Sequence, residues 1–221
     1  MSDQDLTTAH DAWDKRWADE QTRHDWERPE PPVIDAVPLL RKRGVRTVLD
    51  VGCGVGRHAL YLSEQGFDVI ALDASRTGLN AARQAAATSA ATVEFLEGSF
   101  IDLPLPDRSV DFVLAWNVIY HGDRAVVQQA LAEIVRTLTP NGLFQGTFLS
   151  KRHWRYGRGR EIRPGTFVVD EEDEKSHPHF YCDAHEVMAL IHAFDLFRLE
   201  DREQKGAGDY HIEILAELAS E

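Results

Sequence analysis

Val48-Leu-Asp-Val-Gly52-Cys-Gly-Val-Gly56-Arg57-His58 is the stretch that decides the fold of this 221-residue chain. Residues 47–51 are mostly apolar and predict a short buried strand, and the residues that follow Gly56 predict a helix. Three alternate glycines between them allow backbone dihedral angles that other residues avoid, and they let a ligand approach the main chain closely. A strand, a glycine-rich loop and a helix in this order indicate an α/β fold with a ligand site at the loop.

The spacing of the glycines separates this loop from the dinucleotide fingerprint, which requires a third glycine three positions after the second. Arg57 occupies that position, and the glycines instead follow an acid, Asp50. Asp73 comes directly after the next predicted strand, residues 67–72, where its carboxylate can accept hydrogen bonds from both hydroxyls of a ribose. It can equally cap the helix that follows. Strand, loop, helix, strand and acid in this order predict nucleoside binding.

Strands and helices alternate along the rest of the chain, which favours a parallel sheet covered on both faces. The expected strands are 47–51, 67–72, 92–96, 110–116 and 143–149, and the expected helices are 33–43, 56–65, 81–91 and 123–138, with a turn at 140–142. Residues 150–183 show no clear period. A last helix, 184–193, precedes an antiparallel pair, 197–203 and 211–217. This order predicts a Rossmann-like, doubly wound, mostly parallel seven-stranded sheet with an antiparallel C-terminal hairpin.

Composition narrows the classes of function. Hydrophobic residues make up 43% and charged residues 28% of the chain, as in globular proteins. No apolar run approaches the roughly 20 residues needed to cross a bilayer, and the acidic start of the chain lacks the layout of a secretion signal. Cys53 and Cys182 make no disulfide framework, so we expect a cytoplasmic protein. The net charge of −13 argues against non-specific nucleic-acid binding, although the basic stretch 151–160 is either a grip for an anionic substrate or a solvated loop.

Residues 48–75 resemble the first two motifs of the class I S-adenosylmethionine-dependent methyltransferases. Residues 97–104 resemble the segment that borders the adenine in that family, and residues 111–121 resemble the motif that passes beneath the sulfonium. Residues 138–144 resemble the turn into the fifth strand. The resemblance covers about residues 33–149, and its motifs concern the cofactor. The cofactor-binding residues that it implies are Trp13, Trp17, Asp50, Gly52, Cys53, Gly54, Gly56, Asp73, Ala74, Ser75, Ser99, Phe100, Trp116 and Asn117.

Ala12-Trp13-Asp-Lys-Arg-Trp17 and the later Asp25-Trp26-Glu-Arg-Pro resemble the N-terminal arm of thiopurine, halide and tellurite-type small-molecule methyltransferases. In those enzymes the arm folds over the cofactor, where an aromatic face against the sulfonium is favourable. Trp13 and Trp17 are four residues apart and share one helix face, so ordinary packing explains them equally well. The resemblance implies one domain, 1–221, made of an arm (1–32), a cofactor-binding core (33–149) and an acceptor-side cap with the last helix and closing hairpin (150–221).

The candidate catalytic residues come from the fourth strand and the cap. An oxygen or nitrogen acceptor usually needs a base to take its proton, and His121 is the first candidate, followed by Tyr120 and His179. A hydrogen-bonded turn at a helix start explains His121 as well. Histidine and cysteine are zinc ligands, but the spacing of His177, His179, Cys182 and His185 matches no common zinc pattern, so we expect no metal.

These observations predict an enzyme that transfers a methyl group from S-adenosylmethionine to a small-molecule acceptor by in-line displacement, with S-adenosylhomocysteine as the product. The alternatives are an NAD-dependent oxidoreductase, a methyltransferase acting on protein or RNA, and a module that binds the cofactor without turnover. Arg57 counts against the oxidoreductase, and the net charge counts against RNA. We expect a monomer or homodimer whose partners include neither nucleic acid nor membrane.

Overall fold

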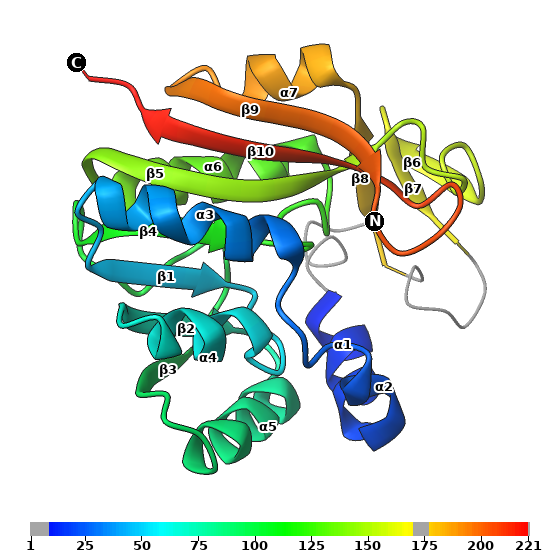
Figure 1. The fold of residues 1–221 in the computed structure, drawn as a ribbon. Helices are drawn as coiled ribbons and strands as arrows, with labels where there is room; N and C mark the ends of the chain where they lie inside the picture. The colour runs from blue at the N-terminus through cyan, green and yellow to red at the C-terminus, as the bar shows by residue number, and fades with distance from the viewer. Residues whose placement is uncertain (1–8, 170–176, 221) are drawn as a thin grey trace.

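A computed structural model describes residues 9–169 and 177–220, and one sheet organises this part of the chain (Figure 1). Its strands are β1 (Thr47–Val51), β2 (Asp68–Asp73), β3 (Val93–Glu97), β4 (Val110–Ala115), β5 (Leu138–Ser150), β6 (Arg160–Arg163), β7 (Thr166–Val168), β8 (His179–Cys182), β9 (Phe194–Glu203) and β10 (Tyr210–Leu218). The first five run parallel in the order β3-β2-β1-β4-β5. The strand order therefore reverses between β1 and β4, where ligands bind in sheets of this type.

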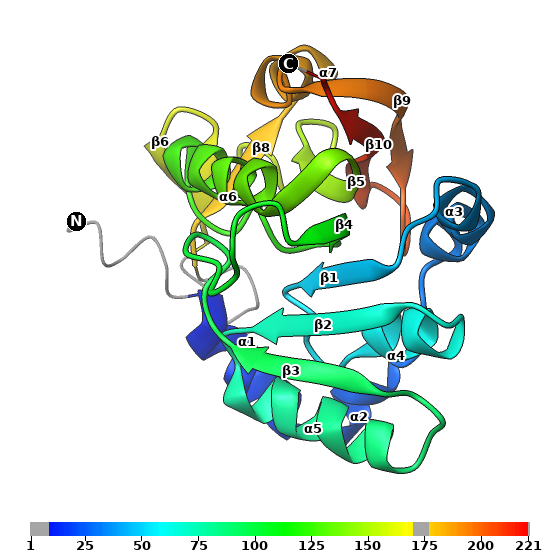
Figure 2. The same cartoon turned by 90° about the vertical axis from the view of Figure 1, so that its left-hand side faces the viewer.

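Helices cover both faces of the sheet (Figure 2). They are α1 (Ala9–Ala18), α2 (Glu20–His24), α3 (Pro31–Lys42), α4 (Arg57–Glu64), α5 (Arg76–Ala87), α6 (Arg124–Thr137) and α7 (Ala184–Leu190). Buried side chains of α3, α4 and α5 pack on one face, and those of α6 and α7 pack on the other. Among the described helices, none is both long and apolar enough to cross a membrane.

The predicted seven-stranded sheet with its antiparallel C-terminal hairpin is confirmed. β10 pairs antiparallel with β5, and β9 pairs antiparallel with β10, so the hairpin extends the sheet beyond β5. Three short strands, β6, β7 and β8, were not expected and branch from the end of β5. The turn expected at 140–142 lies inside β5 instead, where Asn141 has φ +61° and the pairing with β4 shifts register.

The helices α1 and α2 lie beyond the carboxyl ends of the first strands (Figure 1). Asp14 of α1 holds them there, because its carboxylate accepts hydrogen bonds from the Ser75 hydroxyl (2.7 Å) and from the amide and hydroxyl of Thr77 (both 2.9 Å). Ser75 also caps α5 by accepting from the Gly78 amide. The arm is thus fixed to the helix that follows β2, directly over the glycine loop.

Candidate active site

The glycine loop after β1 needs glycine at each of its three positions. Gly52, Gly54 and Gly56 have φ of +66°, +54° and +85°, a region that L-residues with side chains rarely adopt. A Cβ at Gly54 would lie 2.9 Å from the Trp17 ring, and one at Gly56 would lie 2.9 Å from Ala82 of α5. The loop is therefore shaped by close approaches of both the arm and α5.

Asp73 at the end of β2 joins the loop to α5. Its carboxylate accepts hydrogen bonds from the Gly54 and Ser75 amides, both at 2.7 Å. Burial raises the pKa of Asp73, while the amide hydrogen bonds act in the opposite direction. A carboxylate held in this way still has lone pairs that can accept ribose hydroxyls, which is the role expected from the sequence.

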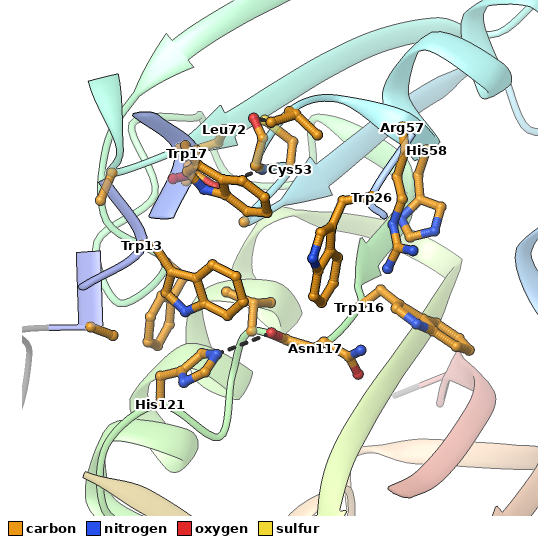
Figure 3. Close-up of a pocket in the computed structure, with 18 of the residues that line it drawn as sticks. Trp13, Trp17, Trp26, Cys53, Arg57, His58, Leu72, Trp116, Asn117 and His121 are labelled. Carbon is orange, nitrogen blue, oxygen red and sulfur yellow. Dashed lines mark hydrogen bonds between the residues drawn. The ribbon is translucent and has the colours of Figure 1, made fainter. Parts of the chain in front are cut away.

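Three tryptophans of the arm form the outer wall of the site (Figure 3). Trp13 and Trp17 are stacked with ring centroids 5.0 Å apart, and Trp26 meets both edge-on at 5.5 and 5.8 Å. The guanidinium of Arg57 and the ammonium of Lys205 lie over the Trp26 ring, 4.8 and 3.2 Å from its centroid. The tryptophans pack against one another, as the packing explanation predicts, and they also line the cavity; their contact with the cofactor stays a prediction.

A cavity lies between the arm and the carboxyl ends of β1–β4, the place where sheets of this type bind ligands. Ten of the cofactor-binding residues expected from the sequence line it: Trp13, Trp17, Gly52, Cys53, Gly54, Asp73, Ala74, Phe100, Trp116 and Asn117. Burial raises the pKa of the Cys53 thiol, and this buried thiol is suited to packing rather than to nucleophilic attack.

The other four expected cofactor residues, Asp50, Gly56, Ser75 and Ser99, lie outside the residues that line this cavity. Gly56 packs against α5 and Ser75 bonds to the arm, as described above. Ser99 forms a bridge with Asp102 in the loop after β3. Asp50 is buried beneath the loop, and burial raises its pKa to about 7 because the charge of Arg57 and the Ala59 amide compensate only in part.

Arg57 and His58 line the cavity without having been expected from the sequence. Arg57 is buried, pairs with Glu30 at 2.8 Å, and has a pKa lowered by burial. The His58 Nε2 atom accepts a hydrogen bond from the Glu30 amide at 3.2 Å, and burial lowers the pKa of His58 far enough to keep the ring neutral. The only feature of the sequence that could have indicated this is their place in the first turn of the helix that follows the glycine loop.

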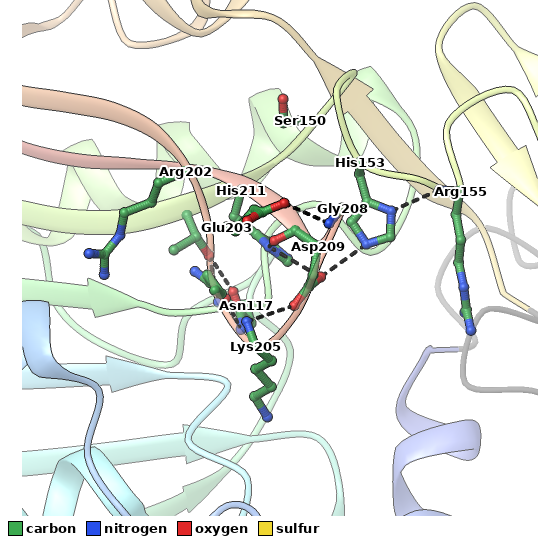
Figure 4. Close-up of polar contacts among 12 residues, drawn as sticks. Asn117, Ser150, His153, Arg155, Arg202, Glu203, Lys205, Gly208, Asp209 and His211 are labelled. Atoms are coloured by element: carbon green, nitrogen blue, oxygen red, sulfur yellow. Dashed lines mark hydrogen bonds and ion pairs between the residues drawn. The ribbon is translucent and has the colours of Figure 1, made fainter.

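A second, more open cavity adjoins the first and shares Trp13, Trp26, Asn117 and His121 with it. Its far wall contains a polar cluster (Figure 4), in which Asp209 bonds to His153 at 3.0 Å. Burial opposes ionisation of Asp209, but this bond and the charge of His211 lower its pKa to about 2. The nitrogen Nε2 of His211 lies 3.3 Å from the Tyr120 hydroxyl.

The basic stretch 151–160 divides between two environments. Lys151 pairs with Glu186 at 2.6 Å, and Arg152 pairs with Asp201 at 3.7 Å. By contrast, His153, Trp154 and Arg155 face the second cavity. The stretch is therefore neither a purely solvated loop nor a continuous basic surface.

All three candidate catalytic residues are buried close together. The ring centroid of Tyr120 lies 4.8 Å from that of His121 and 6.1 Å from that of His179. The metal set considered from the sequence does not assemble, because His185 is exposed on α7 and the Cys182 thiol bonds to the Leu149 carbonyl. His121, 56 residues before His177, joins His177 and His179 instead, with one ligand nitrogen from each lying within 4.8 Å of the others.

Comparisons with known proteins agree with this geometry. A family described as "Methyltransferase domain" matches residues 48–142. An uncharacterized methyltransferase of Mycobacterium bovis is 35% identical over 135 residues, or 61% of this chain and 52% of that protein, so the chain spans about half the length of this relative.

Two solved structures share the fold. A SAM-dependent methyltransferase from Methanosarcina mazei has a TM-score of 0.71 at 21% identity and covers 83% of this chain and 98% of its own. The 1,6-didemethyltoxoflavin-N1-methyltransferase of Burkholderia thailandensis, solved with bound 1,6-didemethyltoxoflavin and S-adenosylhomocysteine, has a TM-score of 0.67 at 21% identity over 90% of this chain and 83% of its own. Residues 48–142, which contain the glycine loop and Asp73, therefore match a methyltransferase domain, and the chain shares the fold of these two solved methyltransferases.

Proposed function

We propose that this protein transfers the methyl group of S-adenosylmethionine to a small-molecule acceptor by in-line displacement. The observation that carries the proposal is the pair of adjoining cavities, which share Trp13, Trp26, Asn117 and His121. One cavity is bordered by the glycine loop and Asp73, and the other by histidines and cations. A cofactor in the first and an acceptor in the second would meet at the shared residues.

The residues of the first cavity fit the cofactor. The Gly52–Gly54 backbone leaves no room for side chains, so a ligand can lie directly against it, and the Asp73 carboxylate can accept the ribose hydroxyls. The sulfonium supplies an activated methyl group, and the indoles of Trp13, Trp17 and Trp26 can stabilise positive charge beside it. Closing the arm over this cavity would exclude water and align the acceptor, which can contribute several kcal/mol, up to about 7–11 kcal/mol in favourable cases.

The second cavity favours a small acceptor that carries a hydroxyl, a thiol or an anionic group. Tyr120 lies in the wall of the second cavity, where its hydroxyl can hydrogen-bond the group that is methylated, and His121 lies where the two cavities meet. Arg155, Lys205 and His153 add positively charged or hydrogen-bonding groups around it. The Burkholderia enzyme, which binds 1,6-didemethyltoxoflavin beside S-adenosylhomocysteine, gives this arrangement a precedent in the same fold.

Ligand-induced stabilisation tests the cofactor part of the proposal. The purified protein is heated with S-adenosylmethionine, S-adenosylhomocysteine or NADH, each at 100 times its dissociation constant or at a matched concentration. A bound ligand should stabilise the fold by about 2.7 kcal/mol, which raises Tm by roughly 5–10 °C for a chain of this length. We expect a shift with the two adenosyl compounds and none with NADH. A shift with NADH alone would overturn the proposal in favour of hydride transfer.

A turnover assay tests the acceptor part. Release of S-adenosylhomocysteine is followed with panels of thiols, phenols, nitrogen heterocycles and metalloid anions, and with bulk protein and RNA as macromolecular acceptors. We expect turnover with one small-molecule class, and a large loss in Asn117→Ala, which alters the shared wall. Met188→Ala, at an exposed position on α7, is the matched control and should retain full activity. Turnover only with protein or RNA would refute the small-molecule assignment.

A further inference from the structure

Two backbone segments bring three histidines together beside the cofactor cavity. The turn after β4 runs alongside the chain that enters β8, because the Gly122 amide donates to the Pro178 carbonyl and the Phe180 amide donates to the Tyr120 carbonyl, both at 2.9 Å. His121 and His179 thereby form an antiparallel bridge. The three histidines, His121, His177 and His179, are 4%, 3% and 1% exposed, so their rings meet in a nearly dry interior.

Hydrogen bonds to carbonyl groups fix the tautomers of two of these rings. His179 Nδ1 lies 2.8 Å from the His177 carbonyl oxygen, and His121 Nε2 lies 3.1 Å from the Asn117 carbonyl oxygen (Figure 3). A carbonyl oxygen only accepts, so both of these nitrogens carry hydrogen. The remaining nitrogens, His179 Nε2 and His121 Nδ1, therefore present lone pairs when the rings are neutral.

Those two lone pairs face each other. His121 Nδ1 and His179 Nε2 are 3.1 Å apart, and His177 Nε2 lies 2.8 Å from the same His121 nitrogen. Two neighbouring ring nitrogens, His179 Nε2 and His177 Nε2, are thus directed at the same atom, His121 Nδ1. A cation placed among the three nitrogens, which all lie within 4.8 Å of one another, can accept a lone pair from each neutral ring.

The geometry around the nitrogens matches what a metal requires. Zinc–imidazole bonds of about 2.0–2.1 Å with tetrahedral angles separate neighbouring nitrogens by about 3.3 Å. Two of the separations here are 3.1 and 2.8 Å, and all three nitrogens lie within 4.8 Å of one another. Histidine ligands characteristically donate their other N–H to a carbonyl or carboxylate, which orients the ring. His121 and His179 both do so.

We propose that His121, His177 and His179 form a binding site for one divalent transition metal ion, with Zn²⁺ as the reference ion. Three neutral imidazoles with an open fourth position are the donor set of a catalytic rather than a structural zinc site. His121 lines both cavities, whereas His177 and His179 line neither, so a fourth ligand would have to approach from the side of His121. The site differs from the set considered in the sequence by replacing Cys182 and His185 with His121.

The catalytic role of this metal rests on the proposed methyl transfer, whereas the binding of the metal does not. A divalent ion at this place would bind the thiol or hydroxyl of the acceptor and lower its pKa, so that the nucleophile loses its proton before attack. The proton leaves to solvent, the sulfur or oxygen lone pair forms the new bond to the methyl carbon, and the carbon–sulfonium bond breaks. His121 then acts as a ligand, and no separate base is needed.

Metal binding is tested without cofactor or acceptor. The protein is stripped with a chelator, and Co²⁺ is titrated while visible absorption is recorded, since imidazole-bound Co²⁺ of low coordination number gives intense bands. We expect one Co²⁺ per chain, displaced by one Zn²⁺. Replacing a ligand in His179→Gln or His177→Gln should weaken binding by more than about 100-fold, because losing only the hydrogen-bond partner behind a ligand costs 10–100-fold. His185→Gln, an exposed histidine on α7, is the matched control and should bind as the wild type does.

Each outcome decides the question. A wild-type protein that binds no Co²⁺ or Zn²⁺ overturns the proposal and leaves a proton shared between His121 and His179 as the resolution of their contact. Equal binding by wild type and both ligand variants also overturns it, because the ion then sits elsewhere. S-adenosylhomocysteine stabilisation, measured on the same stripped samples, reports folding of the variants and the proposed cofactor site independently of the metal. If one variant fails to fold, the other variant and the wild-type spectrum still give the answer.

Discussion

Because Gly54 has no side chain, the Trp17 ring of the arm can pack closely against the glycine loop. A methyl group at this position would meet the Trp17 ring at 2.9 Å, and the backbone there has φ +54°. Gly54→Ala should therefore lose about 1–2 kcal/mol of folding free energy from the backbone alone and more from the clash, and weaken S-adenosylhomocysteine binding by at least about tenfold. Urea unfolding and calorimetric titration measure the two effects.

Gly44→Ala separates the two contributions to the Gly54 effect. Gly44 follows α3 with φ +73°, but a Cβ there would meet no atom within 4 Å. Its substitution should cost about 1 kcal/mol from the backbone and leave cofactor affinity unchanged. Equal losses of affinity in the two variants would show that the contact between loop and arm is unimportant for binding.

Asp50 should make the stability of the protein depend on pH in the neutral range. Its pKa rises from 3.8 to about 7, mainly through burial, so the folded state holds the proton more tightly than the unfolded state. The associated stability is fully present below pH 4 and is lost as pH rises through about 7, at about 1.4 kcal/mol per pH unit. The advantage of Asp50→Asn over wild type in unfolding free energy should therefore grow between pH 5 and 7 and then level off. A constant difference across this range would contradict the raised pKa.

At the residue scale, the sequence predicts contacts that depend on local order along the chain. Gly52, Gly54 and Asp73 follow strands whose carboxyl ends must meet, and the structure places all three at the cavity. The grouping of His121 with His177 depends instead on the bridge between His121 and His179, which lie far apart in the sequence, so their local spacing does not indicate it. The sequence reading therefore weighed only near neighbours as metal ligands and expected no metal, and it did not consider His121 beside His177 and His179.

At the scale of elements, the carboxylate of Asp14 ties helix α1 to the start of α5. Asp14 accepts three hydrogen bonds from Ser75 and Thr77 at the start of α5. Asp14→Ala should release the arm, raise the rate of tryptic cleavage at Lys15 and Arg16, and weaken S-adenosylhomocysteine binding by about tenfold, which corresponds to about 1.4 kcal/mol. Asp35→Ala, which removes an exposed carboxylate on α3, should change neither quantity. Unaltered cleavage in Asp14→Ala would mean that the tryptophans alone hold the arm.

Strands whose own residues are apolar or alternate were predicted from the sequence. Strands that form only because they pair with a distant segment were not. The apolar run of β1 was placed without error, and the closing pair β9 and β10 was found from two alternating runs. β7 and β8 are three and four residues long and are buried against each other, so their pairing depends on tertiary contacts that composition does not reveal. Pro140 to Gly142 carried the composition of a turn, but the long pairing of β5 with β10 keeps the chain extended just beyond it.

At the scale of the whole molecule, the net charge of −13 should distinguish the cofactor from its product. S-adenosylmethionine carries one net positive charge through its sulfonium, whereas S-adenosylhomocysteine is neutral overall. Raising ionic strength from about 0.01 M to about 1 M shortens the Debye length from about 30 Å to about 3 Å and screens the field of distant carboxylates. The affinity for S-adenosylmethionine should then fall about threefold or more relative to that for S-adenosylhomocysteine.

The neutral product serves as the internal control, because non-electrostatic effects of salt act on both compounds alike. Calorimetric titrations of the two ligands at four salt concentrations give the ratio of their dissociation constants directly. A ratio that changes steadily with salt assigns the preference to the field of the whole chain, since indoles in direct contact with the sulfonium, as proposed for Trp13, Trp17 and Trp26, would be screened little by salt. A ratio that stays constant would instead place all discrimination of the sulfonium in that aromatic wall and leave the acidic surface without a part in cofactor binding.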